Sequence, residues 1–560
     1  MAADNGKNMD LDFVDFDGVP FTVPESNFVV FRAENSLEIY CVEYERPLTD
    51  CLVAEIHPSP RNMEFDAQAR DGHFRFGTCE VAVYKNSLWI HSTDAIVVKK
   101  NQNRLSQTVS FHDVSDDPEA RDVRISYSGA LVPADGEVPT SWLAFREIAD
   151  AVVERWMEKM PRVSERRIPM ARQCWWVLGG NQVRFAGSDG EILRGIVPSK
   201  LGYVGLWQWD AYFIAVGIAN GDLNIALEQL RNVVKFQTDT GQLPDVVFPG
   251  GVLIDSSDLP EADRKKLEAD GSPTVGGRTV PLTKPPLLAW TIEQILTGRS
   301  DTVRHQLIKE FAVIVANNQE WWFSHSDIRG EGLPEYLHPY SSGLDDSPVF
   351  DHEVPVPTAD LAAYLSVQDL ILSDWFLDHP EQSIVYAERS QRTHKKLLDL
   401  WDEDLGMFRC GYDVQTLQHR TIVSLLGVFD GRLPAPMIKG VLNDIQVPTR
   451  FAANYPLPTV SFDDIGYRED TMWRGPTWIN TTFLVADGLD RHGYSAEARR
   501  LRVAILDSLE RAGGPVEYLD STSGNRCDTA VRNFSWSAAL YIECAVREFS
   551  ESPYRRASDA

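Results

Sequence analysis

The chain has 560 residues, of which 43% are hydrophobic and 24% charged, and 54 basic against 82 acidic side chains give it a net charge of −28. This length accommodates two or more domains with a large core, and the negative charge disfavours partners such as nucleic acid or an anionic membrane surface. The composition suits an enzyme that acts on a neutral small molecule, without identifying one.

Cysteine usage and the ends of the chain bear on location. The seven cysteines include no Cys-x-x-Cys pair, and their odd number argues against a disulfide framework. Residues 1–15 are acidic and lack the apolar core of a secretory signal, and no run of 18 apolar residues occurs. We therefore expect a cytoplasmic protein. Oligomeric state stays open.

The first quarter of the chain has the pattern of short strands. Residues 1–17 are polar and are expected to form a frayed tail. From 18 to 140, alternating segments such as Cys79–Tyr84 and Val123–Tyr127 are separated by Pro, Gly, Asn and Asp. This pattern predicts an N-terminal antiparallel β-sandwich. The stretch Pro133–Pro139 is predicted to be the linker that follows it.

Residues 141–552 have helical spacing instead. Roughly a dozen helices with no clear strand series favour a helical toroid such as an (α/α) barrel. Long loops gather at one end of such a barrel, and catalytic groups commonly lie on loops. The predicted helical segments are Ile148–Met160, Asp222–Gln237, Pro286–Thr297, Thr302–Phe323, Thr358–Leu377, Ile384–Trp401, Trp478–His492, Ala496–Ala512 and Phe534–Phe549.

Two carboxylates lie far apart in the chain, each in a segment rich in glycine and aromatic residues. Asp345 lies in Ser341–Pro348, and Glu517 lies in Gly514–Asp520. Sugar hydrolysis needs such a pair, because one protonated carboxyl serves the leaving oxygen and one carboxylate activates water. The structural alternatives are a solvated turn or helix cap for Asp345 and an exposed helix-end residue for Glu517.

Aromatic motifs accompany these acids. Trp209 and Asp210 open a predicted helix, where the macrodipole favours an acid that could bind sugar hydroxyls. Trp473 and Arg474 lie in Met472–Trp478, where the arginine fork suits a carboxylate or a sugar oxygen. Tryptophan rings also pack on the apolar faces of sugars. The alternative interpretation of Trp209 and Asp210 is a core tryptophan followed by an acid at the helix N-terminus. The alternative for Trp473 and Arg474 is a buried structural turn.

The order and spacing of the motifs resemble family 63 glycoside hydrolases. The series is Trp-Asp-x-Tyr-Phe, Gly-Gln-Leu-Pro-Asp, Lys-Pro-Pro, Ser-Gly-x-Asp, Trp-Arg-Gly-Pro-x-Trp, Val-Glu-Tyr and Phe-Ser-Trp, within residues 170–545. That family includes mannosyl-oligosaccharide glucosidases, mannosylglycerate and glucosylglycerate hydrolases and bacterial α-glucosidases; family 37 trehalases are more distant. The resemblance implies an (α/α)6 barrel and an exo-acting, inverting α-glycosidase that releases glucose or mannose. We expect no cofactor and no catalytic metal, and a structural Ca²⁺ held by loop carboxylates is left open.

The resemblance also assigns roles to residues. Asp345 matches the general acid and Glu517 the general base. Lys284 is either a contact for an acidic aglycone such as glycerate or a solvated loop lysine. The positions expected to bind substrate are Trp209, Asp210, Asp245, Lys284, Gly343, Trp473, Arg474 and Trp536.

Departures from the family pattern leave the sugar, the linkage and the aglycone open. Tyr340-Ser341 stands where several relatives carry Trp-Glu, and Met472 stands where many carry an aromatic residue. A trehalase-like disaccharide hydrolase and a non-catalytic carbohydrate-binding protein on the same scaffold are the alternative functions. The presence of Glu517 disfavours a phosphorylase, and the absence of His/Cys clusters disfavours a metalloenzyme.

Overall fold

The computed structural model describes residues 20–551 with short gaps. The predicted tail 1–17 and residues 133–138 of the predicted linker lie outside the described residues. The gaps are residues 34, 45, 59–64, 68–71, 95, 102–108, 113–121, 128–138, 188–189, 270–271, 273, 275–277, 353, 412–417 and 453–454.

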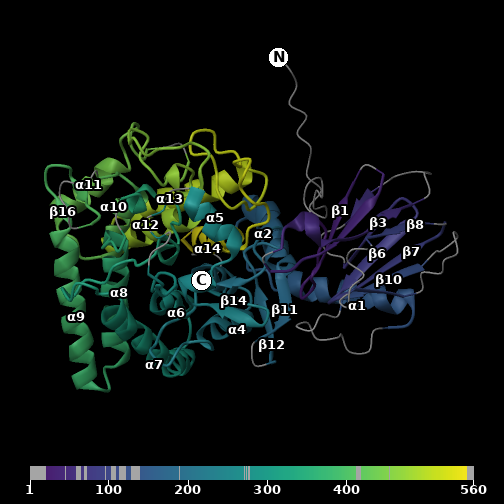
Figure 1. Cartoon of the computed structure of the whole chain (residues 1–560), viewed down its shortest axis with the longest axis horizontal. Coiled ribbons are helices and arrows are strands. Elements are labelled where there is room, and N and C mark those ends of the chain that lie inside the picture. Colours follow the sequence, from purple (N-terminus) through teal and green to yellow (C-terminus); the bar gives the residue numbers. More distant parts are fainter. Residues whose placement is uncertain are drawn as a thin grey trace, which may run out of the picture.

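Two antiparallel sheets form the N-terminal part (Figure 1). One contains, in spatial order, β1 (Phe28–Arg32), β2 (Leu37–Cys41), β3 (Leu52–His57) and β8 (Val97–Lys100). The other contains β4 (Phe65–Ala67), β5 (His73–Phe76), β6 (Cys79–Tyr84), β7 (Ser87–Ser92), β10 (Asp122–Tyr127) and β9 (Val109–His112). Both sheets contribute to one buried apolar cluster, to which β2 adds Ile39 and β6 adds Val81. The predicted antiparallel β-structure is confirmed.

Helix α1 (Trp142–Met157) covers the six-stranded sheet. Its Phe145 packs with Trp89 of β7 in a small buried cluster. The carboxylate of Asp150 accepts a hydrogen bond from the Gly72 N–H and lies 2.6 Å from the His73 ring nitrogen. The first predicted helix is therefore tied to the sheets. It begins before the predicted Ile148, because Ser141 caps it by accepting from the Ala144 N–H.

Helices dominate the rest of the chain. Their bounds are α2 (Ile168–Gly180), α3 (Gln208–Ile218), α4 (Leu223–Val234), α5 (Glu261–Ala269), α6 (Leu288–Leu296), α7 (Asp301–His325), α8 (Ala359–Trp375), α9 (Pro380–Asp399), α10 (Ile422–Leu426), α11 (Ala435–Asp444), α12 (Ile479–Arg491), α13 (Ser495–Arg511) and α14 (Ser535–Glu551). Each predicted helical segment coincides with one of these helices, with ends that differ by a few residues except at α1. The chain therefore combines N-terminal antiparallel sheets with a helical C-terminal part.

Buried and amphipathic helices alternate along this part. Every residue of α3 is buried, and α12 exposes little beyond its last turn, whereas α4, α9 and α13 bury one face. A helix that is apolar on all sides belongs inside a protein, and an amphipathic helix belongs at its surface. The helices α3, α6, α8, α10, α12 and α14 contact one another in that order, and α14 in turn contacts α3.

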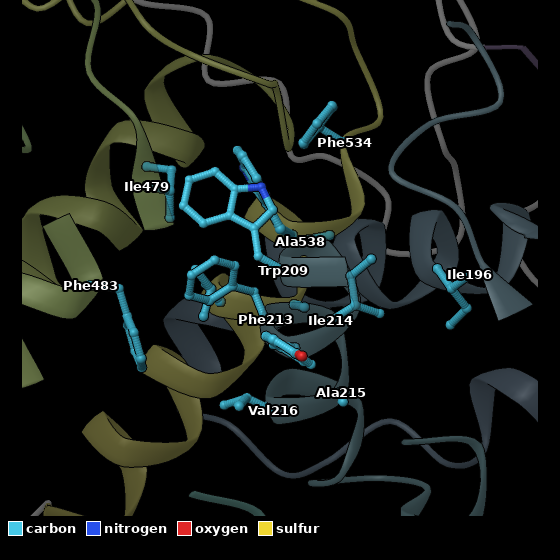
Figure 2. Close-up of a cluster of buried hydrophobic side chains, with 14 of the residues drawn as sticks. Ile196, Trp209, Phe213, Ile214, Ala215, Val216, Ile479, Phe483, Phe534 and Ala538 are labelled. Carbon is cyan, nitrogen blue, oxygen red and sulfur yellow. The ribbon is translucent and has the colours of Figure 1, made fainter. Parts of the chain in front are cut away.

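The closing contact of this series lies next to the tryptophan of the first motif. Figure 2 shows Trp209 and Phe213 of α3 among Ile479 and Phe483 of α12 and Ala538 of α14. Residues from three distant parts of the chain therefore meet around the start of α3.

Short strands interrupt the helical part, where we expected no clear strand series. A hairpin forms from β11 (Gln182–Ala186) and β12 (Ile192–Ile196). A small sheet forms from β13 (Leu206–Trp207), β14 (Val246–Phe248) and β15 (Gly251–Leu253), and a third pair from β16 (Trp401–Asp402) and β17 (Met407–Phe408). Strands this short carry too few residues to show alternation. Across the described ranges, no helix combines the length and apolarity that crossing a membrane requires.

Candidate active site

One narrow cavity of about 60 Å³ collects most of the predicted site residues. Both Asp345 and Glu517 line it, although they lie far apart in the chain. This space holds a few water molecules. The cavity is lined by Pro198, Tyr203, Trp207, Trp209, Asp210, Lys284, Gly343, Asp345, Met472, Trp473, Trp478, Glu517, Phe534 and Trp536.

A tight turn presents Asp345 to this cavity. The Ser342 hydroxyl donates to the Pro339 carbonyl at 2.6 Å and accepts from the Leu344 N–H at 2.9 Å. Gly343 ends the turn with a φ of 72°, in the left-handed region. The Oδ1 atom of Asp345 is buried and makes no hydrogen bond with the described residues. One oxygen of the Asp345 carboxyl is therefore shielded from solvent, although the residue as a whole is only half-buried.

The neighbouring Asp346 has a different task. Its Oδ1 accepts the main-chain N–H of Trp473 at 2.9 Å. Burial raises the pKa of Asp346 to about 6. The carboxyl joins the Asp345 loop to the Trp-Arg-Gly-Pro loop, whereas Asp345 lines the cavity.

Glu517 lies in an extended segment and not at an exposed helix end. Its main-chain N–H donates to the Val531 carbonyl, and its side chain is 3% exposed. The Tyr203 hydroxyl donates to Oε1 at 2.9 Å, and the Val531 N–H donates to Oε2 at 3.0 Å. Burial raises the pKa of Glu517 to about 7, while these two donors lower it. The carboxylate is fixed in place by one donor on each oxygen.

The floor of the cavity is built on the N-terminus of α3. Asp210 lies in its first turn and is buried. Burial raises the pKa of Asp210 well above its usual value, while the charge of Lys284 lowers it. The buried amide oxygen of Gln208 accepts from the Thr283 hydroxyl and from the Lys284 N–H, both at 3.0 Å. These bonds hold Lys284 beside the helix.

Lys284 is a buried cation among acids, so the solvated-loop interpretation is wrong. Its Nζ donates to the Tyr340 carbonyl at 2.6 Å and lies 3.0 Å from Asp245 Oδ1. Burial alone lowers the pKa of Lys284, but Asp245 and then Asp345 reverse the effect, and the net shift is upward. The pKa of Asp245 is raised by burial to about 7 although Lys284 lowers it.

Five tryptophans line the cavity: Trp207, Trp209, Trp473, Trp478 and Trp536. Trp473 stacks on Trp478 with ring centroids 3.7 Å apart and an interplanar angle of 10°. Trp209 meets Trp536 edge to face at 5.5 Å. The Nε1 atom of Trp536 is buried without a hydrogen-bond partner in the described part of the chain. Flat apolar ring faces and an N–H donor that makes no hydrogen bond with the described residues together suit the binding of a sugar ring.

Two of the predicted substrate contacts are not among the residues that line this cavity. Asp245 pairs with Lys284, and Arg474 pairs through both terminal nitrogens with Asp351. Arg474 lines a second cavity of about 380 Å³ that adjoins the first at Asp345. The predicted site lacked six lining residues: Pro198, Tyr203, Trp207, Met472, Trp478 and Phe534. Trp478 and Phe534 belong to the quoted motifs and Met472 begins the segment that contains Trp473, whereas Tyr203 carries no local signal.

Over the described ranges, no group of three or more His, Cys, Asp or Glu side chains is arranged to hold a metal ion. Glu517 contacts the Tyr203 hydroxyl and a main-chain N–H, and Asp245, which does not line the cavity, contacts Lys284.

Three acids line the aromatic cavity. Two of them, Asp345 with an oxygen that has no hydrogen-bond partner among the described residues and Glu517 with one donor on each oxygen, form the kind of pair that cleavage of a glycosidic bond requires. This defines the protein class as a glycoside hydrolase. A family model described as the mannosylglycerate hydrolase MGH1-like glycoside hydrolase domain matches residues 203–537. The chain belongs to this family, and it is an enzyme that hydrolyses glycosides.

Curated relatives agree with this family. The mannosylglycerate hydrolase of Rubrobacter radiotolerans is 26% identical over 429 residues, which are 64% of this chain and 93% of that protein. The glucosylglycerate hydrolase of Mycolicibacterium hassiacum is 24% identical over 455 residues, which are 67% of this chain and 97% of that protein.

Solved structures share the fold. The GH63 mannosylglycerate hydrolase from Thermus thermophilus in complex with glucose is 22% identical with a TM-score of 0.55, over 67% of this chain and 99% of that chain. The neutral trehalase from Saccharomyces cerevisiae is 16% identical with a TM-score of 0.50, over 67% of this chain and 78% of that chain. The expected likeness to family 63 and, more distantly, to trehalases is confirmed.

We predict that Gly343→Ala disrupts the site. A Cβ atom there would lie 2.2 Å from Trp209 Cζ2, and the left-handed φ of 72° adds backbone strain. The cost is about 1–2 kcal/mol for the backbone alone, and the displaced indole should lower kcat/KM at least tenfold. Gly332→Ala is the matched control, because its φ is 76° with nothing within 4 Å. Equal kcat/KM values for the two variants would contradict the role of the close contact with Trp209.

Proposed function

We propose that this enzyme hydrolyses a small α-linked glycoside with inversion and releases glucose or mannose, with Asp345 as general acid and Glu517 as general base. The observation that carries the proposal is the shared cavity, in which Asp345 Oδ1 has no hydrogen-bond partner in the described chain and each oxygen of Glu517 accepts one donor. The two cavity acids thus have environments suited to different tasks.

The reaction needs one proton donor, one proton acceptor and one water. The Asp345 carboxyl protonates the glycosidic oxygen while its bond to the anomeric carbon breaks. Glu517 removes a proton from water, which attacks the same carbon from the opposite face of the ring. Asp345 ends as a carboxylate and Glu517 as a carboxylic acid, and proton exchange with solvent restores both. Inversion follows because a single displacement occurs.

The sugar to be released would be held by the floor and wall of the cavity. Asp210 is buried at the start of α3 and offers its carboxylate to hydroxyls. The open Nε1 of Trp536 offers one donor, and the Trp473 ring offers an apolar face. Hydrogen bonds of this kind strengthen as charge develops on the ring in the transition state.

The aglycone would lie in the adjoining cavity beyond Asp345. Arg468, Arg474 and Asp351 are among its lining residues. Nη1 of Arg468 donates to the Ile465 and Tyr467 carbonyls, so no carboxylate of the described chain neutralises it. We propose a small aglycone that carries a carboxylate, such as the glycerate in the names of the curated relatives. Lys284 would serve by fixing the acids and not by binding that aglycone.

The scaffold would be an (α/α)6 barrel. The closed contact series of buried helices, each followed or preceded by an amphipathic helix, supports this architecture. We divide the chain into a β-sandwich over residues 18–140 and a catalytic domain over 141–552. A cytoplasmic location is part of the proposal and is supported by seven free cysteines.

The substrate proposal is tested by a screen of α-linked glucosyl and mannosyl glycerates, neutral α-glycosides and trehalose, with NMR recording the first anomer released. We expect the greatest kcat/KM with an acidic aglycone, and the β-anomer should appear first. Prior release of the α-anomer would contradict inversion. Cleavage that depends on added phosphate would indicate a phosphorylase, and binding without release of reducing sugar would indicate a non-catalytic protein.

The assignment of the acids predicts the effect of neutral isosteres. Asp345→Asn and Glu517→Gln should each lower kcat by about a thousandfold, as expected for loss of a general acid or base. Asp346→Asn is the matched control for Asp345, because it can still accept the Trp473 N–H through its amide oxygen. Turnover near the wild-type value in either catalytic variant, with an unchanged melting temperature, would refute that residue's role.

The pH dependence follows from the raised pKa of Glu517. Because the base acts when ionised and its pKa is about 7, kcat/KM should fall as the pH drops below about 7. Tyr203→Phe removes a donor that lowers this pKa, so the acidic limb should move up by about one pH unit. Tyr518→Phe is the control, since its hydroxyl donates to Thr529 instead. An acidic limb that Tyr203→Phe leaves unmoved would argue against Glu517 as the base.

A further inference from the structure

The segment of residues 198–207 joins β12 to α3 and supplies three parts of the cavity wall. These are Pro198, Tyr203 and Trp207. Tyr203 is the donor to Glu517, and Trp207 meets the Tyr203 ring edge to face at 5.5 Å. The position of this segment therefore decides how the base is held.

The first contact between the N-terminal part and this segment is made by Lys200. Its side chain is buried, and its Nζ donates to the Thr22 hydroxyl at 3.0 Å and to the Val23 carbonyl at 3.3 Å. Both oxygens belong to the stretch that leads into β1. Burial lowers the pKa of Lys200 well below its usual value. A lysine in such surroundings serves as a hydrogen-bonded tether between the two parts of the chain.

The second contact is apolar. Val204 and Leu206 of the segment belong to the same buried cluster as Val29 of β1 and Val42, which follows β2. All four side chains are almost fully buried. Apolar burial of this extent holds the segment against the edge of the first sheet.

The third contact is aromatic and reaches the cavity wall. Tyr44 stacks on Phe248 of β14 with ring centroids 4.4 Å apart and an interplanar angle of 1°, and it lies 6.2 Å from the Trp207 ring. A Cβ atom on Gly205 would lie 3.2 Å from the Tyr44 ring. Tyr44 thus packs beside the Trp207 end of the segment, as Lys200 does near its other end.

We propose that the N-terminal sheets position the catalytic base, with Lys200 and Tyr44 holding residues 198–207 so that Tyr203 keeps its bond to Glu517. The inference rests on the proposed role of Glu517. Lys200 and Tyr44 are positioning residues, since neither lines the cavity. The family match begins at residue 203, so both of them, and the sheets beside α2 and β11 in Figure 1, lie outside it.

The test uses the full chain and measures kcat, KM, the pH profile of kcat/KM and the melting temperature. Tyr44→Ala should lower kcat about tenfold, leave KM within a factor of three, and move the acidic limb to higher pH. Tyr44→Phe keeps the ring stack and should restore kcat. Tyr84→Ala is the matched control, because Tyr84 packs on Phe145 of α1 and not on the segment. A lowered melting temperature with unchanged kcat and pH profile would overturn the proposal.

A second variant guards against misfolding of the first. Lys200→Met keeps the length and burial of the side chain but removes both hydrogen bonds. It should lower kcat several-fold with the same shift of the acidic limb. An unchanged kcat and pH profile in this variant would overturn the role of Lys200, whatever the outcome for Tyr44→Ala.

The route through Tyr203 is tested by a double-mutant cycle. Because Tyr44 acts through the segment that carries Tyr203, Tyr44→Ala should add little to the loss caused by Tyr203→Phe. If the losses of the two single variants multiply in the double variant, the proposed route from Tyr44 through Tyr203 is overturned. Measuring Glu517→Gln in parallel distinguishes a failure of the proposed function from a failure of the positioning inference. If Glu517→Gln is active, the proposed function fails; if it is inactive while Tyr44→Ala behaves like the wild type, the positioning inference alone fails.

Discussion

Burial of several carboxyl groups around one lysine is the constraint on which this site depends. A buried charge is costly unless a partner or donor compensates it. Lys284 compensates Asp245 directly, and its charge also lowers the pKa of Asp210. Glu517 instead relies on two hydrogen-bond donors, one on each oxygen. The acids therefore differ by what holds each of them, and Asp345 keeps an oxygen with no hydrogen bond to the described residues.

These partners come from distant segments, so the site exists only when the helical part is closed. Glu517 receives one donor from before α3 and another from before α14. The helices α3 and α14 contact each other, and Trp209 of α3 meets Trp536 of α14 edge to face. Tight packing of the buried helices thus fixes the distances between groups that must meet the substrate together. The same packing removes these groups from bulk solvent, which strengthens each electrostatic interaction inside.

The sequence predicted those features that local residues decide. The alternation in the N-terminal part, the helix that begins near Trp209 and the Ser-Gly turn before Asp345 are local, and the structure contains them. The role of Tyr203 was not predicted, because it depends on a hydrogen bond to Glu517, which lies more than 300 residues away in the chain. The motif of Asp245 shows an acid near the site but not Lys284, which pairs with it across the fold. The helix α10 was not predicted, because its five residues are too few to show helical periodicity.

The contacts that the N-terminal sheets make with residues 198–207 and Phe248 are short-range. They comprise ring stacking by Tyr44, apolar packing by Val29 and Val42, and hydrogen bonds from Lys200 to uncharged oxygens. Such contacts act over a few ångströms, so they fix the positions of the groups that touch. Ion pairs act over longer distances and would also change the electrostatic potential in the cavity. Ion pairs also join the two parts of the chain, but they run from Glu25 to Arg184 and Arg194, which are not among the residues that line the cavity. The sheets can therefore affect Glu517 through the geometry of the Tyr203 hydrogen bond. The balance of charge among the acids depends instead on Lys284. Its main-chain N–H donates to Gln208, and its Nζ contacts Tyr340 and Asp245. None of these partners belongs to the N-terminal sheets.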